Sequence, residues 1–410
     1  MRVAIIGTGV SGLGAAYLLS RTHEIQLFER AERPGGHACT IMAPGSGGSP
    51  VALDIGFIVH NDRNYPNLVT LLRDLGVQTR DTQMSFAVSD AARDFEYCAS
   101  RLPLQPGLFL RRATRALVIE ILRFLRHARV ALREPLDGQT LADFTRVHGY
   151  TAHFRDLFLV PLTAALWSTP LGRALDFPAS YALRFLDNHG LLSIGRQHWR
   201  TIVGGSTTYV DRILTPMQDR LSLGREISEI RRDVGGVDIR ERTGATHRFD
   251  AVVIATHADQ ALGMLADATT REREILGQFR YTANEVVLHT DQRLLPRRQA
   301  VRGAWNCQLT TATDREPSVT YYLNRLLRLD EPEHYCVTLN RSAEISPERI
   351  IHSARVRHPQ YTFDSLRAQQ RLPEISGGRT WFCGAYHGNG FHEAGLTSGL
   401  TAANGILALQ

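Results

Sequence analysis

The stretch Val3-Ala4-Ile5-Ile6-Gly7-Thr8-Gly9-Val10-Ser11-Gly12 decides the fold, because an apolar strand pattern runs directly into a glycine-rich turn. An apolar helix pattern follows over 13–19, so the predicted order is strand, turn and helix. Gly7 lets the chain reverse, Gly9 leaves room for a pyrophosphate, and Gly12 lets the helix pack on the strand. The phosphates would meet the N-terminus of the helix at Val10 and Ser11. We therefore predict a dinucleotide-binding turn.

A second predicted strand, Ile25-Gln26-Leu27-Phe28, ends at Glu29, which lies 22 residues after Gly7. An acid at this distance is expected to hold an adenosine ribose. The next segment, Arg30-Ala31-Glu32-Arg33-Pro34-Gly35-Gly36-His37, places a glycine doublet where the backbone would pass close to a second stretch of an extended dinucleotide. A Pro-Gly-Gly loop without a ligand is the alternative, but it does not explain the whole order of strands, turn, helix, acid and doublet.

This doublet resembles that of the FAD-dependent amine-oxidase and phytoene-desaturase superfamily. The resemblance implies FAD, and we expect contacts from Glu29, Arg30, Gly35, Gly36 and His37 in addition to the first turn. Members with cysteine-linked FAD carry that cysteine near the C-terminal flavin loop, whereas Cys383 falls within a predicted strand, so we expect non-covalent FAD. No other G-x-G-x-x-G follows a strand, so a separate NAD(P)H domain is not expected and the electrons should come from the substrate.

The C-terminal half supplies the remaining expected cofactor contacts. Residues 249–256 predict a buried strand that ends in Ala255 and Thr256, after a strand pair at 227–230 and 236–241. In the superfamily the matching segment returns to the FAD domain, and the residue at the position of Ile227 packs beside the adenine. A strand at 380–384 ends at Gly384, and a helix of small residues is predicted to start at Gly395. Its free N–H groups, on Gly395, Leu396 and Thr397, are expected to face the pyrimidine edge of the flavin.

These positions predict an α/β fold in which a Rossmann-like FAD-binding domain carries an inserted α+β substrate domain, as in amine-oxidase-like two-domain flavoproteins. We expect the FAD-binding domain at 1–65, 195–265 and 376–410, and the substrate domain at 66–194 and 266–375. A chain of 410 residues is long enough for two domains with full cores. The insertions predict a hairpin at 84–88 and 95–99, strands at 285–290, 318–323 and 335–339, and helices at 67–75 and 152–166.

The chain is basic in an unusual way, because all 47 basic residues are arginine and the net charge is +6. The arginines are scattered and no nucleic-acid-binding module is visible, so nucleic acid is not expected as a partner. No signal peptide precedes the first strand and no apolar run reaches the roughly 18–20 residues of a membrane span, so we expect a cytoplasmic protein. The five cysteines show no C-x-x-C spacing, which favours separate reduced thiols over disulfides or a metal site.

The segment 108–132 is a long amphipathic pattern with six arginines among Leu, Ile, Val and Phe; they are Arg111, Arg112, Arg115, Arg123, Arg126 and Arg129. One interpretation is a basic helix that makes peripheral contact with the anionic inner face of a membrane. The other, which the sequence favours, is a helix of the substrate domain whose arginines are solvated.

A resemblance to one bacterial group of FAD-dependent oxidoreductases within this superfamily extends over nearly the whole chain. It rests on the motifs LDIGFIV at 53–59, YPN at 65–67, MSFAVS at 84–89, LWSTP at 166–170, NHGLL at 188–192, WRTIVGGS at 199–206 and GFHE at 390–393. Genes of that group often lie beside cyclopropane-fatty-acid synthases, so the resemblance implies an acyl-chain or other lipid substrate. By the same resemblance, Asp54, Gly56, Phe57 and Ile58 lie near the isoalloxazine, together with Gly204-Gly205.

Flavin chemistry asks the protein mainly to position a C–H bond and exclude water, so an obvious nucleophile is not required. Our leading hypothesis is a dehydrogenase or desaturase that passes a hydride from an apolar chain to flavin N5 and then to an unknown acceptor. Its substrate contacts would be Trp167, Trp305, Asn306, Tyr321 and Tyr322, whose alternative is ordinary core packing. The candidate acid–base groups are His387, His392 and Glu393, which lie between the last strand and the flavin-facing helix.

Two alternatives stay open. The first is an amine oxidase, against which stand the absence of an aromatic cage and of any lysine, the residue that holds a water near flavin N5 in many amine oxidases. The second is an FAD protein without net redox change, either an isomerase or a lipid-binding partner of a methyltransferase.

Overall fold

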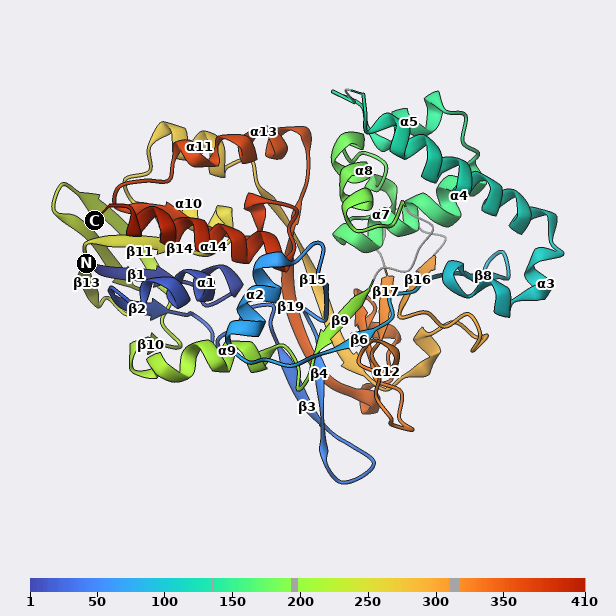
Figure 1. Cartoon of the computed structure of the whole chain (residues 1–410), viewed down its shortest axis with the longest axis horizontal. Helices are drawn as coiled ribbons and strands as arrows, with labels where there is room; N and C mark the ends of the chain where they lie inside the picture. Colours follow the sequence, from blue (N-terminus) through green and yellow to red (C-terminus); the bar gives the residue numbers. More distant parts are fainter. Residues whose placement is uncertain (135, 193–197, 310–317, 410) are drawn as a thin grey trace.

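The first predicted strand lies in the middle of a five-stranded parallel sheet (Figure 1). The computed structural model describes residues 1–134, 136–192, 198–309 and 318–409. In the order β10-β2-β1-β14-β20, the strands are Leu221–Ser222, Glu24–Phe28, Arg2–Ile6, Ala251–Ile254 and Thr380–Phe382. The central strands β1 and β14 are almost wholly apolar and buried, because protein covers both faces of the sheet.

Alternate residues of β1 enter two different cores, as the period of two in a strand requires. Val3 and Ile5 pack against the helices α1 (Val10–Leu19), α2 (Pro66–Asp74), α9 (Thr207–Leu214) and α14 (His392–Leu407). Ala4 and Ile6 pack against the opposite layer, which contains the antiparallel sheet β11 (Ile227–Asp233), β12 (Gly236–Glu241) and β13 (Thr246–Phe249), and the helices α10 (Ala258–Met264), α11 (Thr270–Leu276) and α13 (Phe363–Arg371). These layers form the predicted Rossmann-like domain.

The second domain is built on a mixed seven-stranded sheet of the order β19-β15-β18-β17-β16-β7-β8. Its strands are Ile350–Gln360 (β19), Arg280–His289 (β15), Cys336–Leu339 (β18), Ser318–Tyr322 (β17), Trp305–Leu309 (β16), Phe86–Asp90 (β7) and Phe95–Cys98 (β8). In Figure 1 the long pair β15 and β19 runs through the centre of the molecule, between the parallel sheet and the helices of the second domain.

Helices with a shared aromatic core form the outer part of this second domain (Figure 1). They are α3 (Pro106–Phe109), α4 (Arg112–Ala131), α5 (Leu141–Val147), α6 (Ala152–Phe154), α7 (Val160–Trp167) and α8 (Ala179–Asn188), while α12 (Leu323–Leu326) lies beside β17 and β18. Small sheets join the domains: β3 (Thr40–Pro44) with β4 (Pro50–Asp54), and β5 (Val59–Asn61) with β9 (Trp199–Ile202) and β6 (Thr79–Thr82). Among the described residues, none of these helices is long and apolar enough to cross a bilayer.

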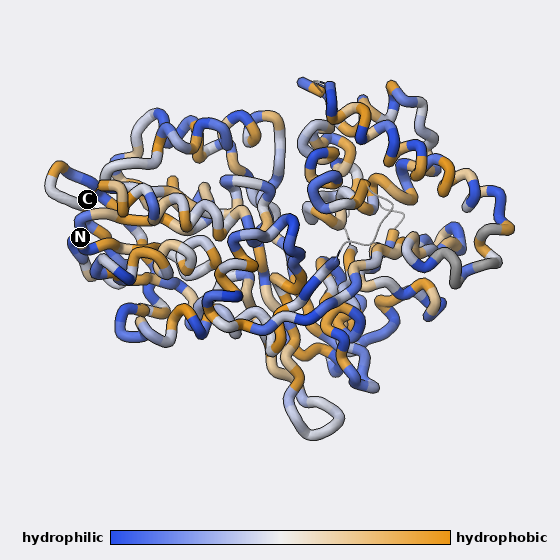
Figure 2. The backbone as a smooth tube through the Cα atoms, viewed as in Figure 1, coloured by the Kyte–Doolittle hydropathy of each residue, from blue (hydrophilic) through white to orange (hydrophobic). Residues whose placement is uncertain are grey.

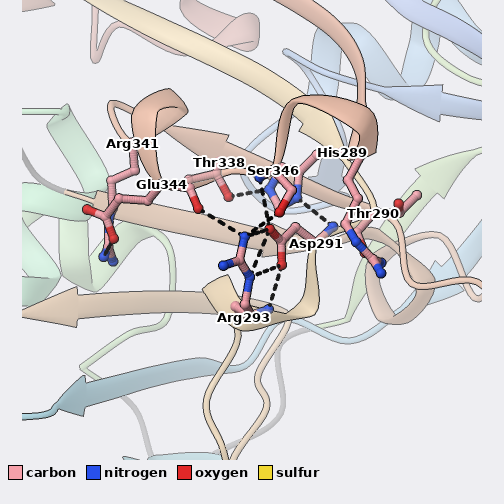
Figure 3. Close-up of polar contacts among 9 residues, drawn as sticks. His289, Thr290, Asp291, Arg293, Thr338, Arg341, Glu344 and Ser346 are labelled. Atoms are coloured by element: carbon pink, nitrogen blue, oxygen red, sulfur yellow. Dashed lines mark hydrogen bonds and ion pairs between the residues drawn. The ribbon is translucent and has the colours of Figure 1, made fainter.

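A polar cluster built on the buried side chains of His289 and Asp291 fastens the end of β15 to the segment that follows β18 (Figure 3). The Nδ1 atom of His289 accepts a hydrogen bond from the amide of Asp291 (3.0 Å), so its Nε2–H donates to Oγ1 of Thr338 (2.7 Å). The carboxylate of Asp291 accepts from the Arg293 guanidinium and from the amide of Ser346, and these bonds hold its pKa well below the usual range. Both ring nitrogens of His289 are therefore used by the protein, which gives this cluster a structural role.

Most predicted elements are present with shifted ends. The predicted hairpin is β7 and β8, whereas the helix predicted at 152–166 consists of α6, a π-helical turn at Arg155–Leu159 and α7. The amphipathic segment 108–132 contains the end of α3 and the whole of α4.

Three segments of the predicted substrate domain pack beside the parallel sheet, and the predicted boundary at 195 lies outside the described residues. Residues 66–77, 266–279 and 363–375 were assigned to the substrate domain, but they contribute α2, α11 and α13 to the cores on either side of the parallel sheet. Their apolar faces pack there because α1, α14 and α10 offer adjacent apolar surfaces.

Candidate functional site

The glycine turn has the geometry that the spacing predicts. Gly7 has φ +98°, and a Cβ on Gly12 would lie 1.9 Å from the carbonyl oxygen of Gly7, so the protein itself requires both glycines. A Cβ on Gly9 would meet no heavy atom within 4 Å. Gly9 is also the N-cap of α1 and supplies no side-chain cap, so the open space lies in front of unsatisfied helix N–H groups. This arrangement fits a bound pyrophosphate.

Glu29 lies at the end of β2 beside this turn, as predicted. Its Oε2 atom accepts hydrogen bonds from the amide and the hydroxyl of Thr8 (2.9 and 2.7 Å), and its Oε1 atom accepts from the amide of Ala31 (3.0 Å). Thr8 was missed by the sequence analysis, because it occupies a variable position of the glycine motif. Arg30 is exposed, and it contributes to lowering the pKa of His257.

The glycine doublet packs directly on the first turn. The amide of Gly35 donates to the carbonyl of Thr8 (3.0 Å), and Gly36 has φ +57°, with a hypothetical Cβ only 3.1 Å from the Cα of Gly9. His37 follows the doublet and is exposed to solvent. The first turn and the doublet thus present backbone to the same open space, as an extended dinucleotide requires.

Asp54 ties the segment after the doublet to the turn at Gly204-Gly205. Its Oδ1 atom accepts hydrogen bonds from the hydroxyl of Thr40 (2.7 Å) and from both the amide and the hydroxyl of Ser206 (2.8 and 2.7 Å). Within the described part of the chain its Oδ2 atom is buried without a partner, and burial raises the pKa of Asp54 to about 6. Gly56 approaches the carbonyl of His37 so closely that a Cβ would lie 2.2 Å from that oxygen.

Phe57 and Ile58 continue this segment toward the second domain. The Phe57 ring stacks on the His392 ring, with a centroid distance of 3.8 Å and an interplanar angle of 8°. Ile58 is buried in a core that it shares with β15 and β18. The segment therefore links the domain of the parallel sheet to the long strands at the centre of the molecule.

The end of β14 and the last strand frame the turn from the other side. The amide of Ala255 donates to the carbonyl of Ile6 (2.8 Å), and the carbonyl oxygen of Ala255 would lie 2.7 Å from a Cβ on Gly7. Thr256 is partly buried beside it. The amide of Gly384 donates to the hydroxyl of Ser398 (2.9 Å), which fastens the end of β20 to α14.

Helix α14 begins three residues earlier than predicted, at His392. The amide of Gly395 is bonded to the carbonyl of Phe391 (3.1 Å), and Leu396 and Thr397 lie within the helix. The free N–H groups therefore belong to the residues 392–394. Gly395 and Leu396 instead pack α14 on α1, where a Cβ on Gly395 would lie 2.8 Å from Cγ1 of Val10.

Ile227 begins β11 and is buried in the core that contains Phe28. A cavity of about 430 Å³ lies along β2 and β13 in this region. Its charged groups already pair with one another, as in the contacts of Glu241 with Arg225 (3.2 Å) and His247 (2.8 Å). The glycine turn, by contrast, keeps open space in front of helix N–H groups.

The three candidate acid–base residues have different surroundings. His392 forms a hydrogen bond from Nε2 to the Tyr209 hydroxyl (2.7 Å), and burial lowers its pKa to about 3. Burial lowers the pKa of His387 to about 4, and its Nε2 atom has no hydrogen-bond partner among the described residues. Both carboxylate oxygens of Glu393 are occupied, because they accept from the amides of Asn67 and Leu68 at the start of α2 (2.9 and 3.0 Å) and from the Asn67 side chain.

These contacts predict a structural effect for Glu393. We expect Glu393→Ala to lower the free energy of unfolding by at least about 2 kcal/mol, because the N-terminus of α2 loses a charged acceptor of three hydrogen bonds. Urea unfolding of the FAD-loaded protein measures this, with Asp219→Ala as the control at an exposed acid. A variant with unchanged stability and lost turnover would instead return Glu393 to the chemistry.

The five predicted substrate residues have different surroundings. Trp305 and Tyr321 are cross-strand neighbours with ring centroids 5.8 Å apart, on one face of β16 and β17. The side-chain amide of Asn306 forms hydrogen bonds to the amide and the carbonyl of Gly303 and to the carbonyl of Thr320. The Tyr322 hydroxyl forms a hydrogen bond to Nδ1 of His334 (2.6 Å), so its ring has a different neighbour from the pair Trp305 and Tyr321. Trp167 packs in the helical core between aromatic rings.

Five histidines from separate segments gather where the two domains meet, and sequence analysis singled out only two of them. We call His37, His60, His257, His358 and His392 the histidine cluster. The ring centroids of His37 and His358 lie 5.6 Å apart, and the His257 ring stacks on Tyr281 at 4.3 Å. The described residues hold no group of three or more His, Cys, Asp or Glu side chains that could bind a metal.

Burial keeps four members of this cluster neutral at pH 7. It lowers the pKa of His60 and His257 to about 4 and that of His358 and His392 to about 3. For the last three residues the proximity of His37 adds to the effect. Nδ1 of His60 and of His257 has no hydrogen-bond partner in the described part of the chain.

Comparison with known proteins agrees with this geometry. The family model for flavin containing amine oxidoreductases matches residues 10–407. An L-amino acid oxidase from Cerastes cerastes is 55% identical over 40 residues, a match that spans 10% of this chain and 8% of that protein.

Solved structures with the same fold cover nearly the whole chain. They include a variant of putrescine oxidase (TM-score 0.73, 15% identity, 100% of both chains) and cyclohexylamine oxidase from Brevibacterium oxydans (TM-score 0.71, 16% identity, 100% of this chain and 99% of that one). A CLA-producing fatty acid isomerase from P. acnes is similar to the same degree (TM-score 0.71, 16% identity, 98% of each chain). At these identities the likeness shows the fold. Together with the glycine turn, the doublet and Glu29, the family match shows that this chain belongs to the flavin containing amine oxidoreductases and is an FAD-dependent oxidoreductase.

Proposed function

We propose that this enzyme dehydrogenates an apolar, uncharged substrate of the fatty-acyl or lipid type. The observation that carries the proposal is the histidine cluster, which places neutral imidazoles beside the cofactor-binding elements. His37 follows the doublet, His257 follows β14 and His392 begins α14. Because burial keeps the rings of His257 and His392 neutral at pH 7, they offer no charge to a substrate.

Three described carboxylates beside the cluster are committed to the protein or to solvent: Glu393 is bonded as above, Asp259 pairs with Arg357 at 2.7 Å, and Asp62 is exposed. The fourth, Asp54, is bonded through Oδ1, and its unpartnered Oδ2 is buried inside the protein, away from solvent. An alkylammonium substrate needs a free carboxylate or an aromatic cage to offset the cost of leaving water. The arrangement therefore favours a neutral substrate over an amine, even though several proteins of the same fold are named amine oxidases.

The described residues fit FAD, with the turn at 7–12 and the doublet at the pyrophosphate and Glu29 at the adenosine ribose. Bound FAD supplies a two-electron acceptor for a substrate C–H bond. The protein then has to orient that bond, exclude water and manage a proton. The Tyr209 hydroxyl occupies Nε2 of His392, so a proton exchanged by this ring is exchanged at Nδ1.

A redox-neutral isomerisation of an unsaturated chain is the second candidate, and the structural likeness to a fatty acid isomerase supports it. It uses the same site and the same class of substrate. It differs in requiring reduced flavin at the start and in releasing no electrons.

The test is an anaerobic absorbance spectrum of the FAD-loaded enzyme before and after addition of dispersed phospholipids with unsaturated, cyclopropane or methyl-branched chains. We expect loss of the oxidised-flavin band and a product with one more double bond. A stable band, together with a shifted double bond after chemical reduction of the flavin, would identify the isomerase. Bleaching by putrescine, cyclohexylamine or L-amino acids without any response to lipids would overturn both candidates.

A further inference from the structure

We propose that helix α4 docks this enzyme on an anionic lipid bilayer through one outward face. We call this set of residues the α4 face; its members are Arg112, Arg115, Ile119, Leu122, Arg126 and Val130. At 3.6 residues per turn these six positions fall within about 80° of the helix circumference. All six side chains are exposed.

The opposite side of α4 explains why this face points outward. Leu117, Phe124 and Ala128 are buried in the aromatic core of the helical region. Arg129 and Arg123 fix the flanks, because they donate to the carbonyls of Leu192 and Gly149. The helix therefore has one fixed orientation on the protein. Figure 1 shows α4 at the outer edge of the molecule, on the side away from the parallel sheet.

Two arginines of the α4 face, Arg112 and Arg126, carry positive charge that no neighbouring carboxylate of the described residues offsets. Glu120 is the single acid in the sequence of α4, and it is engaged by Thr151 (2.5 and 3.0 Å) and by Arg123 (3.5 Å). Within the part of the chain that the structure describes, no carboxylate lies within ion-pair distance of Arg112 or Arg126. Charge complementarity therefore calls for an anionic partner.

The exposed aliphatic side chains decide what kind of anionic partner fits. The aliphatic members of the α4 face, Ile119, Val130 and Leu122, are 65%, 51% and 48% exposed, so they form an apolar strip on a charged helix. Figure 2 shows hydrophobic and hydrophilic residues alternating along this outer helix. A bilayer accommodates both kinds together, because the aliphatic groups enter the acyl boundary while guanidinium groups meet lipid phosphates. A nucleic acid or an acidic protein surface would leave the protruding aliphatics without a function.

Membrane docking through the α4 face does not depend on the substrate proposed above. A water-soluble substrate would leave the α4 face unchanged, and a lipid substrate would give the docking a purpose. The two proposals can therefore fail separately, since one is measured by flavin absorbance and the other by partition.

The experiment is vesicle flotation of the FAD-loaded enzyme with phosphatidylcholine vesicles, with and without phosphatidylglycerol. We expect flotation only with the anionic vesicles. Each basic residue near such a surface strengthens binding about fivefold, so Arg112→Gln with Arg126→Gln should lower the partition coefficient about thirtyfold. Ile119→Ser with Leu122→Ser should also lower it, at unchanged thermal stability, because both side chains are exposed.

Matched controls remove the same groups elsewhere. Arg80→Gln with Arg280→Gln removes two exposed arginines, and Met42→Ser with Val234→Ser removes two exposed apolar side chains. Both controls should float like the parent. Absence of flotation with phosphatidylglycerol, an equal loss in the controls, or unchanged flotation of the Ile119/Leu122 variant would each overturn the proposal. In the last case the contact would be purely electrostatic, as with a soluble acidic partner.

Discussion

Replacing Gly9 with aspartate is expected to abolish FAD binding while leaving the apoprotein folded. The backbone of Gly9 has φ −64° and ψ 175°, which any residue adopts, and a Cβ there meets no heavy atom within 4 Å. Aspartate is also a favoured N-cap residue, so α1 should gain a cap. Its carboxylate would occupy the space in front of the helix N-terminus and repel a pyrophosphate with about 4 kcal/mol per charge pair at about 4 Å.

That repulsion corresponds to about a thousandfold loss of affinity. FAD content after purification and titration of the apoprotein with FAD measure it, and circular dichroism checks the fold. Gly9→Ser is the matched control, because it adds a similar cap without charge and should lose much less affinity. Gly12→Val should fail to fold at all, since its Cβ would collide with the carbonyl of Gly7. Undiminished FAD binding by Gly9→Asp would show that the pyrophosphate lies elsewhere.

The glycine turn could be predicted from the sequence because each of its requirements is local. Gly7, Gly12 and the end of β2 at Glu29 depend on sterics within a single strand-turn-helix-strand unit. The period of two in β1 likewise predicts burial on both sides without predicting which helices cover each face. The general fold could be predicted from the sequence for the same reason.

The start of α14 could not be predicted from the sequence, because no residue at this boundary has the side chain of a typical N-cap. Its N-cap is Phe391 with no side-chain cap, whereas a Ser, Thr, Asp or Asn would mark the boundary. The partner of Glu393 is a helix start 326 residues away in sequence, so nothing near Glu393 indicates its structural role. The small residues from Gly395 onward mark the packing on α1, and this made the helix appear to begin there.

The histidine cluster was missed for a related reason. Its members come from five segments that only the tertiary structure brings together, and an isolated histidine in a sequence carries no information on burial. Burial then sets the pKa, so the neutrality of the site is a property of packing and not of composition.

The same burial leads to the second large effect, a loss of stability in mild acid. Six histidines have pKa values lowered to about 3 or 4 in the folded protein, namely His60, His257, His289, His358, His387 and His392. In the unfolded chain each takes up a proton near pH 6.5. Between pH 6.5 and about 4 the unfolded state therefore binds more protons, so stability falls as the pH falls.

Two other groups of residues set the limits of this window. Asp54 acts in the opposite direction, because its folded pKa of about 6 exceeds the unfolded value of 3.8, and folding gains from its protonation between these values. The paired acids with lowered pKa, such as Asp291 and Glu272, lose their stabilisation only at lower pH. The histidines therefore dominate between pH 6.5 and 4.5.

The size of the effect follows from the number of groups. At two pH units below the pKa of the unfolded chain, each histidine that stays neutral in the folded protein lowers the free energy of unfolding by up to about 3 kcal/mol. Six such groups together reach the roughly 5–15 kcal/mol that stabilises a typical domain. We expect the FAD-loaded enzyme to release its flavin and unfold with a midpoint near pH 5, as followed by flavin fluorescence and circular dichroism.

Replacing a single buried histidine tests whether these residues cause the loss of stability in acid. His289→Gln keeps a donor toward Thr338 but removes one titrating group. Its stability should therefore fall less between pH 7 and pH 5 than the stability of the parent, which moves the unfolding midpoint to lower pH when the two proteins are compared from equal stability at pH 7. His198→Gln removes an exposed histidine and should leave the midpoint in place. Potentiometric measurement at pH 5.5 should show a net uptake of several protons on urea unfolding, which is the direct signature of neutral buried imidazoles. Uptake of fewer than two protons would mean that these rings are charged in the native state, and it would remove the electrostatic argument for an uncharged substrate along with the predicted acid lability.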